Sequence, residues 1–308
     1  MKAEPFIEDL GFGEGMRWHD GRLWYSDFFL HRISSAAPDG SVRLEVEIAD
    51  QPSGLGWLPD GRLLFVAMKT QKVMRREADG SLAVHADLSG LARFHTNDML
   101  VTANGTAFVG CFGYDLDAYM TENGAPVLFS EPGPPKAPLM RVPPDGKATI
   151  ASDGHRFPNG MALLDGGRTL IVAETFKPCL TAFDLSDDGT LSNRRVWAEL
   201  PQTIAPDGIS ADSDGAIWCA NAFSPDCVRI GQGGEILERV ETSMNAFCCA
   251  LGGSDGRTLF VATAEADPET KAVCGMIEIA TVKSPPRAGR LASHQLALPN
   301  CNLYTRRS

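Results

Sequence analysis

The stretch Pro59-Asp60-Gly61-Arg62-Leu63-Leu64-Phe65 places a turn that ends in glycine directly before a short run of apolar residues. Five other segments repeat this pattern: 19–25, 103–109, 165–171, 213–218 and 254–260. The marker glycines of the six copies lie 40, 44, 62, 48 and 41 residues apart. Strand-rich repeats of this period are typical of β-propellers with one four-stranded blade per repeat. The sequence therefore predicts an all-β, six-bladed β-propeller that forms a single domain over residues 1–308.

The two ends of the chain are expected to close the ring. Residues 4–12 precede the first repeat and include an alternating strand pattern around Phe6 and Ile7, whereas the last repeat lacks one strand. Pairing the N-terminal strand with the segment near Met276-Ile277-Glu278-Ile279 would remove the exposed sheet edges.

Equivalent positions of the repeats carry oxygen-bearing side chains. Counting back seven residues from the first marker glycine gives Glu14, and counting back eight from the third, fourth and fifth gives Asn97, Asn159 and Asp207. Asn and Asp beside Pro or Gly are common turn residues, which is the simpler interpretation of any one frame. Their recurrence in register favours a metal site at the propeller axis. Carboxylate and amide oxygens suit Ca²⁺ best, while Mg²⁺, Mn²⁺ and Fe²⁺ stay open and Zn²⁺ is less natural without His or Cys.

Composition excludes several partners. The net charge of −11 argues against a nucleic-acid partner, since such proteins present a basic face. No apolar run has the length of a secretion signal or a membrane span. The eight cysteines show no C-x-x-C spacing, so they are expected to be reduced, and Cys248-Cys249 to pack in the core. A cytoplasmic protein without membrane contact is expected.

The longest spacing between markers contains an insertion, residues 111–137. It holds Tyr114 and the run Glu131-Pro132-Gly133-Pro134-Pro135. Its Pro and Gly content predicts a loop, either a plain surface excursion or a segment near the pocket mouth. In the latter case Tyr114 is a candidate substrate contact.

The frames Gly13-Glu14-Gly15, Asn97-Asp98, Pro158-Asn159-Gly160 and Pro206-Asp207-Gly208 resemble the gluconolactonase/regucalcin (senescence marker protein) family, and the resemblance covers nearly the whole chain. It implies a six-bladed propeller with one catalytic divalent metal in its central channel. Carried over to this chain, it makes Glu14, Asn159 and Asp207 metal ligands and places Asn97 against both metal and substrate. In sugar-lactone members an arginine commonly stands two residues before the Asn97 position, where this chain has His95. A sugar lactone is therefore not assured, and the similar squid-type phosphotriesterase and paraoxonase propellers share the metal geometry.

These residues predict a divalent-metal-dependent hydrolase of a small lactone, a sugar lactone or a related cyclic ester. Asp207 is one candidate for the general base. Asp98 is the other, although it is as readily explained as a residue that orients Asn97. His95 is expected to bind substrate or to move a proton, and His155 to be a surface or turn residue. Two alternatives remain: a binding propeller with a structural cation, and a phosphotriesterase.

Overall fold

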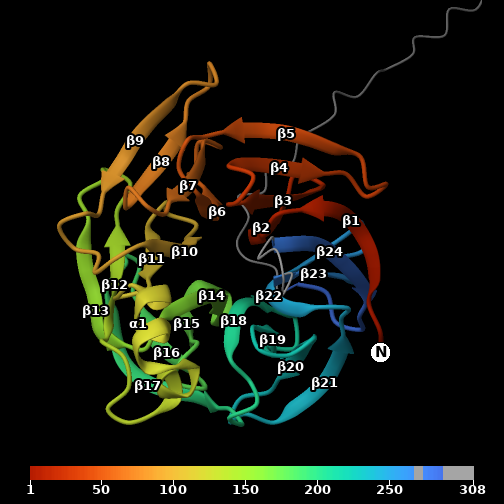
Figure 1. The fold of residues 1–308 in the computed structure, drawn as a ribbon. Coiled ribbons are helices and arrows are strands. Elements are labelled where there is room, and N and C mark those ends of the chain that lie inside the picture. The colour runs from red at the N-terminus through yellow and green to blue at the C-terminus, as the bar shows by residue number, and fades with distance from the viewer. Residues whose placement is uncertain (267–272, 287–308) are drawn as a thin grey trace, which may run out of the picture.

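The computed structural model describes residues 1–266 and 273–286. Their strands form six four-stranded antiparallel sheets set around a central axis, so the predicted six-bladed β-propeller is confirmed (Figure 1). From the axis outward, blade 1 contains β2 (Gly13–His19), β3 (Arg22–Asp27), β4 (Arg32–Ala36) and β5 (Val42–Glu47). Blade 2 contains β6 (Pro52–Trp57), β7 (Leu63–Ala67), β8 (Lys72–Arg76) and β9 (Leu82–Asp87). Blade 3 contains β10 (Thr96–Val101), β11 (Ala107–Cys111), β12 (Ala137–Val142) and β13 (Thr149–His155).

The second half of the chain repeats this order. Blade 4 contains β14 (Pro158–Leu164), β15 (Thr169–Glu174), β16 (Cys179–Leu185) and β17 (Leu191–Glu199). Blade 5 contains β18 (Pro206–Ala211), β19 (Ile217–Asn221), β20 (Asp226–Ile230) and β21 (Ile236–Glu241). Blade 6 contains β22 (Asn245–Gly252), β23 (Thr258–Ala266), β24 (Val273–Thr281) and, outermost, β1 (Glu4–Leu10).

The predicted closure of the ring is confirmed. β1 pairs antiparallel with β24, with Glu4 opposite Ile279 and Ile7 opposite Ile277, so the first strand of the chain completes the last blade. Figure 1 shows β1 in red directly beside β24 in blue. The free edge of β24 is thereby covered by the other end of the chain.

Each marker glycine occupies the turn between the innermost and the second strand of its blade. All six have a φ angle between 72° and 91°, a region that side chains with a Cβ rarely adopt. The glycines recur because this turn needs that backbone conformation in every blade.

Hydrophobic side chains fill the spaces between neighbouring blades. Six core clusters each join two adjacent sheets, including blades 6 and 1. Between blades 1 and 2, for example, Trp24 and Ile33 pack against Leu55 and Phe65. The blades therefore stabilise one another laterally, and the innermost strands are held side by side around the axis.

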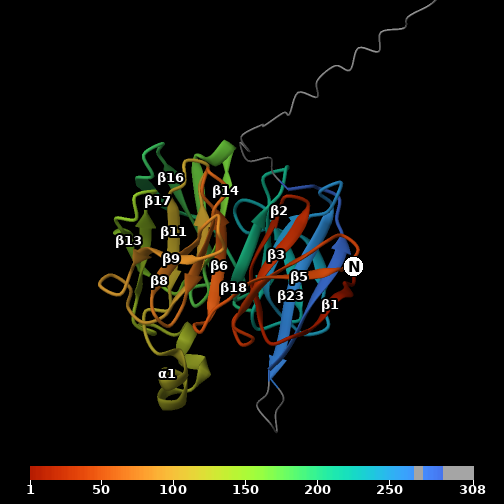
Figure 2. The ribbon, with the colours of Figure 1, turned by 90° about the horizontal axis from the view of Figure 1, so that it is seen from above.

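The insertion is partly helical, so the prediction of a loop over residues 111–137 was wrong. It contains α1 (Leu116–Asn123) and the 3₁₀ helix η1 (Ala125–Phe129), and its two ends belong to β11 and β12. Asp115 caps α1 by accepting a hydrogen bond from the backbone N–H of Ala118 at 3.0 Å. Pro126 lies in the first turn of η1, where proline is tolerated because its missing N–H would have no partner there. Figure 2 shows α1 projecting from one face of the propeller.

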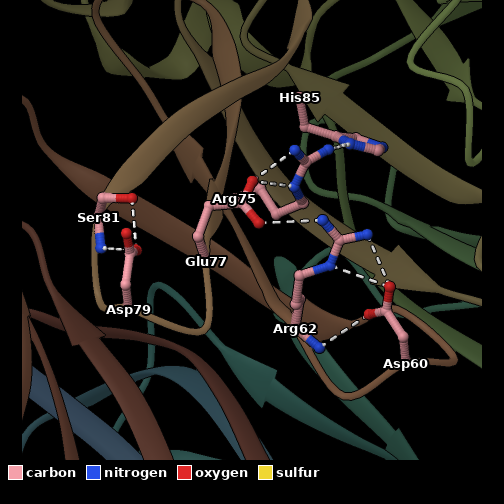
Figure 3. A network of polar contacts seen from close by, with 7 residues as sticks. All are labelled: Asp60, Arg62, Arg75, Glu77, Asp79, Ser81 and His85. Carbon is pink, nitrogen blue, oxygen red and sulfur yellow. Dashed lines mark hydrogen bonds and ion pairs between the residues drawn. The ribbon is translucent and has the colours of Figure 1, made fainter.

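A polar network on blade 2 fixes the marker turn of this blade, which joins the innermost strand β6 to β7. Arg62 contacts Asp60 at 2.6 Å and Glu77 at 3.0 Å, and Glu77 also accepts hydrogen bonds from Arg75 (Figure 3). Arg75 in turn contacts His85 on the outermost strand. These partly exposed pairs tie three strands of the blade together, and each contributes little to stability on its own. No helix in residues 1–266 and 273–286 is long and apolar enough to cross a bilayer.

Candidate functional site

Five inner strands begin with the same arrangement. The second residues of β2, β6, β10, β14 and β18 are Glu14, Ser53, Asn97, Asn159 and Asp207, and all five are buried. In blades 2 to 5 the pairing with the next strand shifts register at this residue and its successor, which is a β-bulge. A bulge turns a side chain out of its normal alternation. These residues therefore lie in strands rather than in turns, and in blades 2 to 5 the same β-bulge sets the direction of the side chain.

Glycine next to the bulged residue lets the inner strands approach one another. A Cβ added to Gly54 would lie 2.1 Å from the backbone nitrogen of Met99, and one on Gly160 would lie 2.3 Å from the carbonyl oxygen of Asp207. On Gly208 it would lie 2.7 Å from the Cα of Cys248. The Asn-Gly and Asp-Gly pairs thus satisfy backbone packing at the axis. Blade 3 has Asp98 at this position instead.

The two asparagines are aligned by a continuous chain of hydrogen bonds. Ser53 Oγ donates to Asn97 Oδ1 at 2.8 Å, and Asn97 Nδ2 donates to Asn159 Oδ1 at 3.0 Å. Asn159 Nδ2 donates to Thr175 Oγ1 at 3.1 Å, and Thr175 Oγ1 donates to the carbonyl of Pro206 at 2.9 Å. Each amide oxygen still has a second lone pair for another partner. The chain connects blades 2, 3, 4 and 5 at the axis.

Three carboxyl groups share the same buried space. Burial raises the pKa of Glu14 well above its usual value, and the nearby charges of Asp207 and Asp98 raise it further. Burial, followed by the charge of Asp98, likewise raises the pKa of Asp207, against a smaller opposing effect of Asn159. The pKa of Asp98 is also raised by burial and is partly lowered by Arg17. Desolvation explains all three directions, and repulsion between neighbouring carboxylates adds to it for Glu14 and Asp207.

The donor set fits a hard divalent cation. Asp98 Oδ1 and Asp207 Oδ1 are buried and have no hydrogen-bond partner, which is costly for carboxylates unless a cation faces them. Arg17 lies nearby, but its guanidinium donates to the backbone carbonyls of Met16 and Met99 at 2.7 Å each. Among the residues that the structure describes, no group of three or more His, Cys, Asp or Glu side chains is arranged to hold a metal. A cation here would therefore depend on the asparagine oxygens as well as on the carboxylates.

The structure brings together Glu14, Asn97, Asp98, Asn159 and Asp207, whereas His95 and Tyr114 contact aromatic neighbours instead. His95 is half-buried, stacks on Phe94 with ring centroids 4.0 Å apart, and has a pKa lowered by burial and by Lys69. Tyr114 packs against Tyr119 in the insertion, and its buried hydroxyl has no hydrogen-bond partner. Burial raises the pKa of this phenol. Substrate contact by these two residues stays a prediction.

His155 is neither a surface nor a turn residue, so that prediction was wrong. It is fully buried at the end of β13, where Nδ1 contacts Glu174 Oε1 at 3.2 Å and Nε2 contacts Ser152 Oγ at 3.0 Å. Burial opposes ionisation of Glu174, but His155, Thr181 and the backbone N–H of Arg156 outweigh it and hold its pKa far below the usual value. This network fixes the backbone that leads into Asn159.

Sequence reasoning missed several residues of the site. Arg17, Ser53 and Thr175 each contact or orient the central group, and Cys248 Sγ accepts a hydrogen bond from the backbone N–H of Met16 at 3.3 Å. Ser53 and Cys248 were detectable, since both lie eight residues before a marker glycine. The expectation that Cys248 and Cys249 pack in the core is confirmed, because both are buried free thiols.

Comparison with known proteins identifies the family. The model of the SMP-30/gluconolactonase/LRE-like region matches residues 12–265. The chain belongs to this family. It is similar to pentonolactonase XacC of Haloferax volcanii, at 28% identity over 273 residues, which cover 84% of each chain.

Two solved structures show the same fold. The gluconolactonase XC5397 of Xanthomonas campestris matches with a TM-score of 0.69 and 21% identity, over 90% of this chain and 89% of its own. The calcium-binding protein regucalcin of Agrobacterium tumefaciens matches with a TM-score of 0.71 and 20% identity, over 93% of this chain and 98% of its own. At these identities the likeness establishes the propeller and nothing finer.

Proposed function

We propose that this family member hydrolyses a small lactone at a divalent cation held on the propeller axis by Glu14, Asn97, Asn159 and Asp207. The observation that carries the proposal is the pair of buried carboxylate oxygens, Asp98 Oδ1 and Asp207 Oδ1, that have no hydrogen-bond partner beside two aligned asparagines. Family membership and the likeness to a pentonolactonase support the choice of a lactone as substrate. Ca²⁺ is the first candidate because every donor is an oxygen.

When bound, the cation would polarise the lactone carbonyl as a Lewis acid. Asn97 and Asn159 keep their oxygens in place through the hydrogen-bond chain that begins at Ser53. A carboxylate takes a proton from the attacking water, whose oxygen bonds to the carbonyl carbon. The ring C–O bond then breaks, and the leaving oxygen takes up a proton to give a hydroxy acid. Burial that raises the pKa of a carboxyl makes it a better proton acceptor near neutral pH.

We assign the proton acceptor to Asp98 and leave Asp207 as its competitor. Asp98 stands where the other inner strands have glycine, so its carboxylate is additional to the repeated ligand positions. Asp207 occupies a ligand position, and a carboxylate bound to a cation is a poorer base. The two assignments can be told apart by measurement. If Asp98 is the proton acceptor, its substitution abolishes turnover without loss of the cation.

The test measures lactone opening with a pH indicator on protein that has been stripped with a chelator and then supplied with Ca²⁺, Mn²⁺, Mg²⁺, Zn²⁺ or Fe²⁺. Turnover is expected only with a cation. Asp207→Asn and Glu14→Gln are expected to lose both cation binding and turnover, whereas Asp98→Asn keeps the cation and loses at least a hundredfold in kcat, about the contribution of one general base. Glu47→Gln, an exposed strand residue on β5, is the matched control.

Each other outcome points to a different function. Full turnover by stripped protein contradicts the metal-dependent mechanism. A bound cation without turnover of any lactone supports a binding propeller, and turnover of phosphotriesters alone supports the phosphotriesterase alternative.

A further inference from the structure

Arg17 is a basic side chain on the same strand as Glu14. It lies on β2, three residues after Glu14, and is half-buried. In a regular strand, two residues three positions apart point to opposite sides, because successive side chains alternate. Between these two residues, however, the pairing of β2 with β3 shifts register, and Gly15 has a φ angle of 59°. This β-bulge adds one residue to β2, so Glu14 and Arg17 come to the same side of the strand.

Ring contacts of the next two residues show which side this is. Trp18 stacks on Phe260 of blade 6, with ring centroids 5.6 Å apart, and His19 stacks on Trp57 of blade 2 at 3.8 Å. Because side chains alternate along a strand, Arg17 points the same way as His19. The guanidinium therefore lies on the side of β2 that faces blade 2 and, beyond it, blade 3.

The guanidinium of Arg17 joins two inner strands that are not neighbours. It donates to the carbonyl of Met16 on β2 and to the carbonyl of Met99 on β10, at 2.7 Å each. Blade 2 stands between these two strands, and its inner strand β6 packs against both of them. The side chain thus spans blade 2 and fixes blade 3 relative to blade 1.

The far end of this connection lies beside an axial carboxyl group. Met99 directly follows Asp98, so Arg17 binds the backbone next to that residue. The intervening strand packs tightly against the same backbone: a Cβ added to Gly54 would lie 2.1 Å from the nitrogen of Met99 and 2.8 Å from the carbonyl carbon of Asp98. Close packing of this kind holds the guanidinium at a fixed position relative to Glu14 and Asp98.

The charge of Arg17 acts on the axial carboxyl groups. Burial raises the pKa of Glu14 and of Asp98, and the guanidinium opposes this shift in both. A divalent cation would balance two of the negative charges that Glu14, Asp98 and Asp207 carry when all three are ionised. The guanidinium balances the third. Since it has the same sign as the cation, it also repels it.

We propose that Arg17 is a positioning residue of the axial site, a fixed counter-charge that holds β2 and β10 around the carboxylates and limits how tightly the divalent cation binds. The inference rests on the cation of the proposed function and adds the residue that sets its affinity. The guanidinium acts on the carboxylates with or without the cation. Its contribution to stability is therefore largest when no cation balances the same charges.

Calorimetric titration with Ca²⁺, in the absence of any substrate, tests the effect on affinity. Arg17→Gln keeps N–H donors but removes the charge, whereas Arg17→Lys keeps the charge. Ca²⁺ is expected to bind about tenfold more tightly to Arg17→Gln than to the wild type, because a nearby like charge is lost. Arg17→Lys is expected to bind Ca²⁺ as the wild type does.

Thermal unfolding with a chelator or with saturating Ca²⁺ tests the effect on stability. Arg17→Gln is expected to lower the melting temperature more with the chelator than with Ca²⁺, because tighter cation binding offsets part of the loss. Arg22→Gln is the matched control. Arg22 lies on β3 of the same blade and also donates to two backbone carbonyls, those of Ser35 and Ser41. Its loss is expected to be the same in both conditions and to leave Ca²⁺ affinity unchanged.

A merely mechanical connection between the strands gives a different result. Arg17→Gln would then lose as much stability with Ca²⁺ as without it, or fail to fold in both conditions, and either result overturns the counter-charge. Unchanged Ca²⁺ affinity in Arg17→Gln, or an affinity in Arg17→Lys that matches Arg17→Gln, also overturns this inference and leaves the proposed function standing. If the wild type binds no cation, the axial site and this inference are overturned together.

Discussion

At the residue scale, the buried pair of His155 and Glu174 holds in place the backbone that leads into Asn159 at the axis. Glu174 accepts hydrogen bonds from Thr181 at 2.6 Å and from the backbone N–H of Arg156 at 2.9 Å, and Arg194 contacts it at 3.1 Å. The carboxylate is thus fully compensated, unlike Asp98 and Asp207, which face the axis. Two kinds of buried acid therefore coexist, one that is fully hydrogen-bonded and one that keeps an oxygen without a hydrogen-bond partner.

The ionised form of Glu174 is expected to stabilise the fold in a pH-dependent way. Because its pKa in the folded state lies far below its unfolded value of about 4.3, its contribution is complete above that value and declines as the pH falls below it. Glu174→Gln is expected to cost about 3 kcal/mol of unfolding free energy at pH 7, since it leaves His155 and Arg194 without their charged partner. Urea unfolding of both proteins between pH 7 and pH 3 measures this difference. A difference that stays constant over the whole range would contradict the assignment.

The glycine beside Asn159 is expected to tolerate no side chain. Gly160→Ala would force a Cβ to within 2.3 Å of the carbonyl of Asp207 and 2.6 Å of the nitrogen of Ile209, both backbone atoms. A loss of about 2 kcal/mol and weaker cation binding are expected, as for other overpacked cores. Gly90→Ala is the matched control, since its added Cβ would meet nothing within 4 Å. Thermal unfolding and calorimetric titration with Ca²⁺ report the two effects.

At the element scale, repeated turns were predictable from sequence but the insertion was not. The glycine markers recur because one backbone conformation is required in every blade, so six copies reinforce one another. Residues 111–137 have no second copy in the chain, and their helices depend on a local cap at Asp115 and on packing of Leu128 against Phe157 and Phe176. Such tertiary contacts leave no periodic pattern in the sequence. His155 was misassigned for the same reason, because two of its partners, Glu174 and Arg194, lie 19 and 39 residues away.

The strand that closes the ring offers a direct test at this scale. In β1, Ile7 is buried in the core between blades 6 and 1, whereas the adjacent Glu8 is exposed. Ile7→Ala is expected to cost about 2–4 kcal/mol, the usual range for removing a buried aliphatic side chain, and Glu8→Ala less than about 0.5 kcal/mol. Chemical denaturation of the two variants measures both values. Equal stabilities would mean that β1 does not hold blade 6 in solution.

At the scale of the whole molecule, the axis is where all blades meet and where two buried carboxylate oxygens have no hydrogen-bond partner. A cation bound there would contact residues from blades 1, 3, 4 and 5 at once, so its binding would be linked to the stability of the entire ring. The shared position of Glu14, Asn97, Asn159 and Asp207 was predictable because the repeat fixes their register. Which substrate they would serve was not, since the repeat fixes only the shared positions.

Cation binding is therefore expected to raise the unfolding free energy of the intact protein. At a free Ca²⁺ concentration about 100 times the dissociation constant, mass action adds about 2.7 kcal/mol. Calorimetric melting with and without a chelator measures this increase. It is expected to vanish in Glu14→Gln and to persist in Glu47→Gln, so a chelator-insensitive wild type would argue against the axial site.

The bulge at the start of the inner strands separates the side chain that faces the axis from those that pack between blades. In blades 1 to 5 this position carries a polar side chain that differs from blade to blade, and Ser53 in blade 2 has neither charge nor amide there. A change at this position would therefore alter the polar groups at the axis while the glycine turns and the sheet pairing of the blade stay as they are.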